Sequence, residues 1–332
     1  MVLHGQPFSF SFADSLVAEA SGIPQSALHT DVDAICHAFD AVRPVAARLG
    51  VAPPAPRLAG LTYVHVSTLG ARVTIESYAP EPRITPCIGS PQEIDLLEEP
   101  RDYMSCPLVS QRLKLVEGLL QRRPDARTSI GHDFQGPVTT AVLLMGQAFF
   151  MLPYEEPALA QRLLTFCVRS ALHYVRALRR HRGEPFQPGQ CWLPDDFAGV
   201  FGPDKFRQLV IPAWDLMYEG LSATWRSLHS ELLREEHLPL LAEVRIGSFD
   251  PGTDQYLSPE ALKRSCPALF TLRIRPADVC VRSPAELVEM YERYASFHPR
   301  EITFGLESLA DEAKIAVLLE TARRLGPRRN EA

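Results

Sequence analysis

The chain has 332 residues, of which 46% are hydrophobic and 22% are charged, and this composition is typical of a globular protein with a sizeable core. It excludes a disordered or fibrous chain. The 34 basic and 40 acidic residues give a formal charge of −6 without a basic stripe that follows a phosphate backbone, so we expect a small-molecule ligand and no nucleic-acid partner.

Cysteine usage and hydropathy bear on the compartment. The seven cysteines are scattered and contain no Cys-x-x-Cys pair, which argues against a disulfide framework and against a zinc ribbon. No Lys or Arg precedes the first apolar residues, and the longest apolar stretch, residues 138–153, is too short to cross a bilayer. We therefore expect a cytoplasmic protein without a membrane partner. The sequence leaves the oligomeric state open, a homodimer included.

The first part of the chain is irregular. In chain order, the predicted elements are a helix over residues 31–49, β-like runs over 61–67 and 71–76, a short helix opened by a Ser90–Glu93 capping box, and a helix over 108–122. A turn at Leu69-Gly70 would join the two β-like runs as a hairpin.

From residue 127 onward, short β-rich runs alternate with helical segments, and each junction carries a helix start signal. The predicted strands cover residues 127–131, 191–193, 224–228, 245–249, 268–274 and 301–304. The helices that follow them start at Gly136-Pro137 and continue over 155–180, cover 205–219 and 235–244, start at Ser258 and at a Ser283–Glu286 capping box, and cover 310–325.

This alternation implies parallel strands, because a parallel connection needs a crossover long enough to hold a helix. Six such units favour a closed (β/α)₈ TIM barrel of the α/β class over an open doubly wound sheet. Two further barrel strands then have to come from the first half of the chain. We expect a single domain with an irregular N-terminal portion.

Several segments, taken in order, resemble the uroporphyrinogen decarboxylase superfamily, whose members are single (β/α)₈ barrels. They are Ser90-Pro91-Gln92-Glu93-Ile94-Asp95-Leu96-Leu97, Gly136-Pro137-Val138-Thr139-Thr140-Ala141 with Gly146, Asp195-Asp196-Phe197-Ala198 with Phe206 and Ile211-Pro212, and the strand that leads to His229. The resemblance implies an N-terminal portion over residues 1–84 that contributes to the barrel, a barrel over 85–326, and a tail over 327–332.

Two chemistries dominate that superfamily: decarboxylation of porphyrinogen acetate arms, and methyl transfer between a methylated corrinoid protein and a thiol. The central and C-terminal segments look more like the methyltransferase branch. The Arg-Gln-Ala-Gly-Arg type of segment, with which the decarboxylases clamp substrate carboxylates, is not found in this sequence. The resemblance thus implies a methyltransferase that works with a corrinoid partner protein carrying methylcobalamin.

The methyltransferase branch binds zinc through a His-x-Cys pair and a second cysteine late in the chain. The matching triplet here is His229-Ser230-Glu231, and Glu307 is the ligand-capable residue at the late position. The resemblance therefore implies a Zn²⁺ site formed by His229, Glu231 and Glu307, with carboxylates where the family has thiolates. An alternative is that His229 bonds to a neighbouring strand while Glu231 is exposed.

Polar residues follow the predicted strands, where a barrel has its active site. Asp195 and Asp196 are candidates for acid or base catalysis or for stabilising a cationic intermediate, because like charges held close raise one pKa. His132 with Asp133 is a candidate proton-transfer pair. The alternative for both pairs is a polar turn that bonds to local backbone groups.

Further polar residues are candidates for substrate binding. Arg273 and Arg275 alternate along one predicted strand and therefore form a candidate clamp for a carboxylate, unless that face is solvated surface. Asp250 and Asp254 follow the preceding strand and are placed with them in substrate binding.

Three hypotheses for the function follow. The first is methyl transfer with a metal ion at His229, Glu231 and Glu307. The second is decarboxylation without a metal, as in the uroporphyrinogen decarboxylases, with Asp195 or Asp196 stabilising a protonated pyrrole. The third is a barrel without catalysis that binds a corrinoid, a porphyrin or a partner protein.

Overall fold

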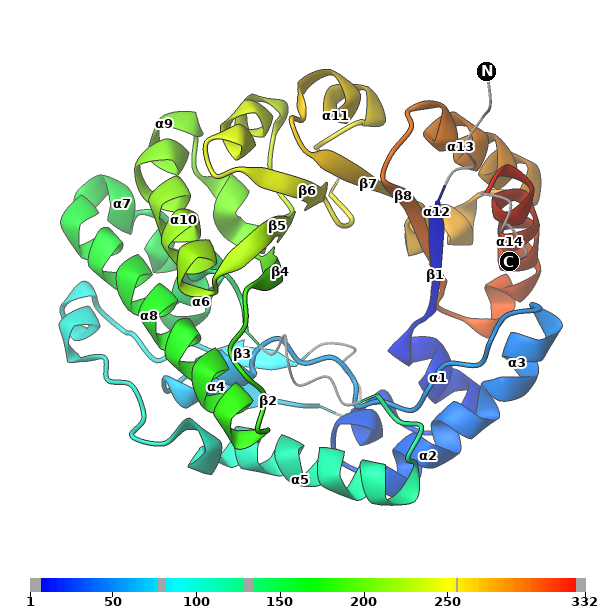
Figure 1. Ribbon diagram of the computed structural model, residues 1–332, viewed down its shortest axis with the longest axis horizontal. Helices are drawn as coiled ribbons and strands as arrows, with labels where there is room; N and C mark the ends of the chain where they lie inside the picture. Colours follow the sequence, from blue (N-terminus) through cyan, green and yellow to red (C-terminus); the bar gives the residue numbers. More distant parts are fainter. Residues whose placement is uncertain (1–6, 77–81, 128–133, 255, 327–332) are drawn as a thin grey trace.

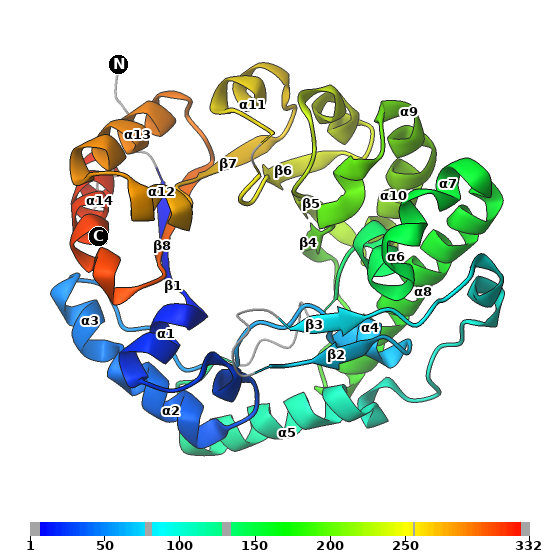
Figure 2. The same cartoon turned by 180° about the vertical axis from the view of Figure 1, so that it is seen from behind.

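The computed structural model describes residues 7–76, 82–127, 134–254 and 256–326. Within these ranges, six strands form one sheet that curls around the centre of the molecule, and helices cover its outer side (Figures 1 and 2). In their order across the sheet, the strands are β1 (Phe8–Phe12), β8 (Glu301–Leu306), β7 (Leu269–Arg273), β6 (Ile246–Asp250), β5 (Ala223–His229) and β4 (Gly189–Pro194). All neighbouring strands in this order are parallel.

Helices connect the strands. The α-helices before β4 are α1 (Asp14–Ser21), α2 (Val32–Ala41), α3 (Arg43–Arg48), α4 (Val64–Thr68), α5 (Pro107–Arg122), α6 (Pro137–Met145), α7 (Leu152–Glu155) and α8 (Pro157–His181). Those after β4 are α9 (Pro203–Lys205), α10 (Ile211–Gly220), α11 (Pro259–Ser265), α12 (Pro276–Val281), α13 (Pro284–Ser296) and α14 (Glu312–Leu325).

Shorter elements complete the chain. The 3₁₀-helices are η1 (Gln25–His29), η2 (Pro91–Leu96), η3 (Tyr103–Ser105), η4 (Gly146–Phe150), η5 (Asp196–Val200), η7 (Glu235–Ala242) and η8 (Leu309–Asp311), and η6 (Phe206–Val210) is a π-helical turn. Two short strands, β2 (Arg72–Thr74) and β3 (Arg83–Thr85), pair with each other in antiparallel fashion.

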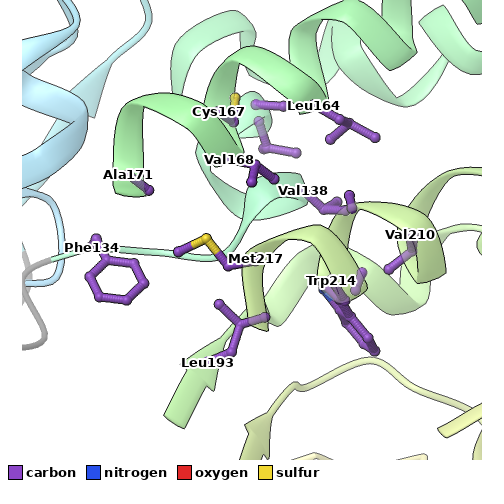
Figure 3. Close-up of a cluster of buried hydrophobic side chains, with 14 of the residues drawn as sticks. Phe134, Val138, Leu164, Cys167, Val168, Ala171, Leu193, Val210, Trp214 and Met217 are labelled. Atoms are coloured by element: carbon purple, nitrogen blue, oxygen red, sulfur yellow. The ribbon is translucent and has the colours of Figure 1, made fainter. Parts of the chain in front are cut away.

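The hydrophobic core lies between the sheet and the surrounding helices. Because successive strand residues point to opposite faces, the apolar residues of each strand gather on its outer face. Leu193 of β4, for example, lies among Val138 of α6, Val168 of α8 and Met217 of α10 (Figure 3). A second cluster of buried residues joins β1 and β8 to α1, α2 and α14. This packing leaves the inner face of the sheet to polar side chains.

Several sequence predictions are confirmed. The five predicted strands from residue 191 onward correspond to β4–β8. The predicted helix over 108–122 is α5, and the Ser283–Glu286 capping box begins α13, with both of its side-chain hydrogen bonds formed. The predicted strand over 127–131 lies largely outside the described residues. Within the described part of the chain, no helix combines the length and the apolar character needed to cross a membrane.

The barrel prediction is confirmed in part: the described residues form a curled parallel sheet of six strands, which is compatible with a TIM-like barrel, where eight strands were expected. Other predictions are wrong. The β-like run over 61–67 contains helix α4, in which His65 is fully buried and lies 3.1 Å from the Ser170 hydroxyl, so tertiary packing outweighs the preference of its valines for strands. The hairpin at Leu69-Gly70 is also wrong, because β2 pairs with β3 instead. The helix over 31–49 is divided at Val42, and Pro44 lies in the first turn of α3.

Extended segments lie beside β4 where further barrel strands were expected. The Gly136 N–H donates a hydrogen bond to the carbonyl of Pro194 at the end of β4. The side chain of Gln135 donates to the Thr62 hydroxyl at 2.9 Å. These bonds attach residues 60–63 and the segment before α6 to the edge of the sheet, although neither segment forms a regular strand.

Candidate active site

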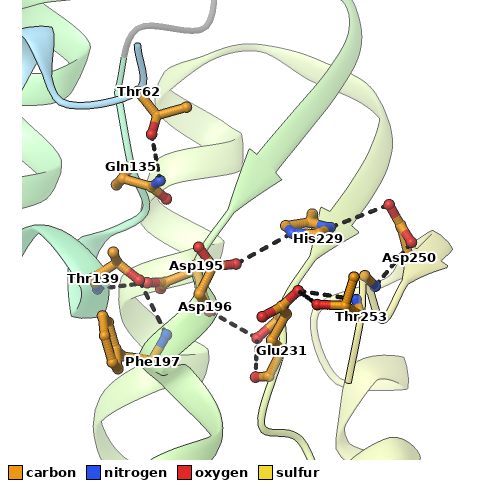
Figure 4. Close-up of polar contacts among 12 residues, drawn as sticks. Thr62, Gln135, Thr139, Asp195, Asp196, Phe197, His229, Glu231, Asp250 and Thr253 are labelled. Carbon is orange, nitrogen blue, oxygen red and sulfur yellow. Dashed lines mark hydrogen bonds and ion pairs between the residues drawn. The ribbon is translucent and has the colours of Figure 1, made fainter. Parts of the chain in front are cut away.

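The carboxyl ends of β4, β5 and β6 bring Asp196, His229 and Asp250 together on the inner side of the sheet (Figure 4). Parallel pairing produces this arrangement, because it aligns the carboxyl ends of neighbouring strands at one edge. In the register of the sheet, Pro194 lies beside His229, and His229 lies beside Asp250.

His229 lies between two carboxylates. Its Nε2 is 3.3 Å from an Asp196 carboxylate oxygen, and its Nδ1 is 3.2 Å from Asp250 Oδ2. Burial of the ring acts to lower the pKa of His229, but the two carboxylates outweigh this effect and raise the pKa to about 9. At neutral pH the ring is therefore an imidazolium whose Nδ1–H donates a hydrogen bond to Asp250, while its Nε2 lies at ion-pair distance from Asp196.

Asp250 connects His229 to a guanidinium group. Its Oδ2 accepts a hydrogen bond at 3.3 Å from an Nη atom of Arg273, the last residue of β7. Burial acts to raise the pKa of Asp250, while the His229 and Arg273 charges outweigh it and hold the pKa below its ordinary value. The two cations and two anions of Asp196, His229, Asp250 and Arg273 balance, which limits the cost of holding them partly buried.

Asp195 has a different environment from its neighbour. It is fully buried and accepts hydrogen bonds from the backbone N–H of Thr139 at 2.7 Å, the backbone N–H of Val138 at 3.3 Å and the indole N–H of Trp214 at 2.6 Å. Burial raises its pKa to about 6, although these hydrogen bonds act to lower it. Asp195 therefore fixes the first turn of α6, and Asp196 is the carboxylate that faces His229.

A cavity of about 320 Å³ lies next to His229. It is lined by Gly60, Leu61, Thr62, Tyr63, Gln135, Trp192, Pro194, Asp196 and His229. The ring of Trp192 lies over His229, with 5.7 Å between the ring centroids. Gln135 lines this cavity, and its buried amide oxygen accepts no hydrogen bond from the described residues. Unpaired polar atoms beside a cavity indicate groups that a bound ligand would satisfy.

Trp192 and Gln135 are site residues that sequence reasoning missed. Trp192 lies two residues before the end of β4, so strand alternation places it on the same inner face as Pro194. Gln135 immediately precedes the Gly136-Pro137 helix start that the sequence did single out. The positions of Trp192 and Gln135 could be read from the sequence. Their role could not, because it depends on knowing which face of the sheet lines the cavity.

The described residues do not fit a zinc ion at the predicted ligands. Both ring nitrogens of His229 face carboxylates, which leaves no free nitrogen for a metal. Glu231 Oε1 instead accepts hydrogen bonds from the backbone N–H and the hydroxyl of Thr253, and Glu307 accepts one from Ser15. In the part of the chain that the structure describes, no three His, Cys, Asp or Glu side chains converge on one point as metal ligands would.

The remaining predicted site residues are not brought together. Arg275 forms an ion pair with Asp278 at 2.8 Å at the start of α12, so it does not share a ligand with Arg273. Asp254 accepts a hydrogen bond from the backbone N–H of Tyr256, which fixes its own turn. His132 lies outside the described residues.

Comparison with known proteins agrees with this architecture. The family model for uroporphyrinogen decarboxylase (URO-D) matches residues 60–266, which is more than half of the chain. A solved methyltransferase from Methanosarcina mazei superposes with a TM-score of 0.70 at 14% sequence identity, over 97% of this chain and 95% of the methyltransferase. No curated protein sequence matches the chain significantly. The residues matched by the family model include Asp196, His229 and Asp250. Because the model covers more than half of the chain, the chain belongs to the uroporphyrinogen decarboxylase family.

Proposed function

We propose that this protein is an enzyme that decarboxylates a small carboxylic acid, with His229 as the proton donor. The observation that carries the proposal is the imidazole ring held between Asp196 and Asp250 on the wall of a cavity. Family membership supports the reaction type, because decarboxylation gives the family its name.

The atoms and electrons of this reaction match the site. When the bond between a substrate carbon and its carboxylate breaks, CO₂ leaves and the electron pair remains on that carbon. The carbon then takes up one proton, which the Nε2–H of His229 would supply. An electron-rich ring accepts the electron pair only after a proton from solvent has added to it, and this proton is lost again when His229 protonates the substrate carbon. The Asp196 carboxylate, which also lines the cavity, would stabilise the protonated, cationic ring. Solvent returns the proton to His229 after product release.

The substrate class follows from the cavity and from Arg273. A volume of about 320 Å³ accommodates a single-ring acid. The sequence has no arginine-rich segment of the kind that clamps the many carboxylates of uroporphyrinogen. Arg273 is not among the residues that line the cavity but is paired with Asp250 beside His229, and its Nε, which donates no hydrogen bond to the described residues, is a candidate donor to one carboxylate. We therefore expect an acetic acid substituent on one electron-rich ring.

Methyl transfer from a methylated corrinoid protein to a thiol is the second candidate. The likeness to the Methanosarcina methyltransferase favours it, since that likeness extends over nearly the whole chain. Methylation of a thiol, however, releases a proton instead of consuming one, and His229 is already protonated at neutral pH. A zinc ion would activate the thiol, but the predicted ligands do not converge on one. The geometry therefore favours decarboxylation.

The test compares two reactions on the same purified protein. A monopyrrole acetic acid and uroporphyrinogen are incubated with the enzyme, and released CO₂ is measured. In parallel, free methylcobalamin and a thiol are supplied, and loss of the methyl group is followed by absorbance. We expect CO₂ release from the monopyrrole acid, with kcat lowered on the order of 10²–10⁴-fold in His229→Asn.

Glu307→Gln is the matched control, because Glu307 also follows a strand of the sheet but bonds to Ser15. It should leave the rate of CO₂ release unchanged. Equal activity in His229→Asn and the wild type would refute the role of His229. Methyl loss without CO₂ release would favour the second candidate.

A further inference from the structure

The inner face of the sheet is unusually polar. In parallel barrels, the interior is filled mainly by bulky branched apolar side chains. Here the inner face of strands β4 to β8 lines a cavity of about 440 Å³. The polar and aromatic side chains on its wall include Gln190, Trp192, Ser227, Ser248, Thr271 and Thr303. We call this cavity the interior chamber.

The wall of the interior chamber is a built network of hydrogen bonds. The Ser248 hydroxyl donates to the Ser227 hydroxyl at 2.7 Å, and the side-chain amide of Gln190 donates to Ser227 at 3.2 Å. The Trp225 indole N–H donates to Ser248 at 3.2 Å. These bonds hold the polar groups in place, so the chamber is a preformed structure.

One polar atom of the chamber has no hydrogen-bond partner among the described residues. The buried hydroxyl oxygen of Thr303 forms no hydrogen bond with the described residues. Thr303 comes from β8, on the opposite side of the chamber from Ser227 of β5, because β6 and β7 lie between these strands in the sheet. A ligand in the chamber would therefore meet hydrogen-bonding groups from two sides.

The chamber and the site cavity adjoin each other. Trp192 lines both of them, and Asp250 lines the chamber while its carboxylate bonds to His229. Charged side chains lie at the two ends of the chamber, Asp250 at one end and Arg300 and Glu301 at the other, and the polar wall groups between them are hydroxyls and an amide. Trp192 adds aromatic surface.

We infer that the interior chamber is a second binding site, for an uncharged ring that carries amide or hydroxyl groups. Its size lies in the range of small-molecule sites, and its wall combines aromatic surface with a few oriented polar groups. Between these ends, the hydroxyls and the amide offer no counter-ion to a charged ligand that has lost its hydration. The chamber does not depend on the reaction proposed at His229.

The test uses two uncharged ring amides, nicotinamide and uracil, and their carboxylated counterparts, nicotinate and orotate. Binding to the full-length protein is measured by calorimetry and by tryptophan fluorescence, since Trp192 and Trp225 lie at the chamber. We expect at least one amide to bind more tightly than its carboxylated counterpart. Thr303→Val, which removes the unpaired hydroxyl while keeping the shape, should weaken binding by about 5–10-fold.

Two further variants separate this site from the proposed reaction. Thr271→Leu extends a larger side chain into the chamber and should abolish binding, and a thermal melt checks that the variant is folded. His229→Asn should keep chamber binding even where turnover is lost. If neither amide binds the wild type, or if Thr303→Val and folded Thr271→Leu bind as the wild type does, the interior chamber is not a binding site.

Discussion

Raising the pH above neutrality should remove a defined part of the stability of this protein. The pKa of His229 is about 9 in the folded chain and 6.5 in the reference state, and its side chain is only 19% exposed. At about 1.4 kcal/mol for each tenfold change in proton affinity, the charged ring contributes about 3 kcal/mol. Because the folded-state pKa is raised, this stability is fully present below pH 6.5 and is lost as the pH rises through about 9.

Urea denaturation of the wild type and of His229→Gln at a series of pH values from 6 to 10 measures this contribution. The difference between their unfolding free energies should shrink by about 3 kcal/mol across that range, because other titrating groups cancel in the comparison. His37→Gln, at an exposed position on α2, controls for the loss of a histidine as such. If the wild type and His229→Gln lose stability in parallel, the ring is not held as an imidazolium between Asp196 and Asp250.

Three further outcomes are expected. Gly136→Ala should lower the unfolding free energy by about 2–4 kcal/mol in urea, because a Cβ there would come within 2.5 Å of the Asp195 side chain. Gly189→Ala is the control: its Cβ would meet nothing within 4 Å, so the unfolding free energy should fall by about 1 kcal/mol at most. Asp195→Ala leaves two backbone donors of α6 and the indole N–H of Trp214 on α10 unpaired and should cost about 4 kcal/mol in the same assay. Added Zn²⁺ should not raise the melting temperature of the wild type above that of His229→Asn, and a zinc-dependent rise that this variant abolishes would instead support the predicted metal site.

Local patterns predicted the second half of the chain well. Strong helix start signals stand between short β-rich runs there, as at Ser283, where the capping box fixes the beginning of α13. In the first half, helix α5 was predicted correctly, but two other predictions failed for physical reasons. Strand β1 was missed, although residues Phe8–Phe12 alternate Phe and Ser. Its partner in the sheet is β8, almost 300 residues away, and no helix start signal of the kind that marks the later strands is close to it. In α4, the burial of His65 beside α8 overrode a β-rich composition.

The site shows a similar limit. The sequence placed Asp196, His229 and Asp250 at strand ends, and parallel topology then made them neighbours. It could not tell Asp195 from Asp196, because two adjacent carboxylates at the end of a strand look alike until their partners are known. Asp195 packs closely against Gly136 and accepts a hydrogen bond from the indole of Trp214, and these contacts give it a structural role beside α6. Those partners lie 59 and 19 positions away in the chain and carry no local signal.

The charge balance of the site supports proton donation over metal binding. Asp196, His229, Asp250 and Arg273 sum to zero before a substrate enters, so a bound carboxylate brings one negative charge. Loss of CO₂ with transfer of the His229 proton leaves a product without that charge, and the negative charge then resides on the two aspartates. A divalent ion at His229 would have to displace the imidazolium proton and separate the ring from both carboxylates. The same contacts that raise the pKa of His229 therefore favour an acid at this position and oppose a metal.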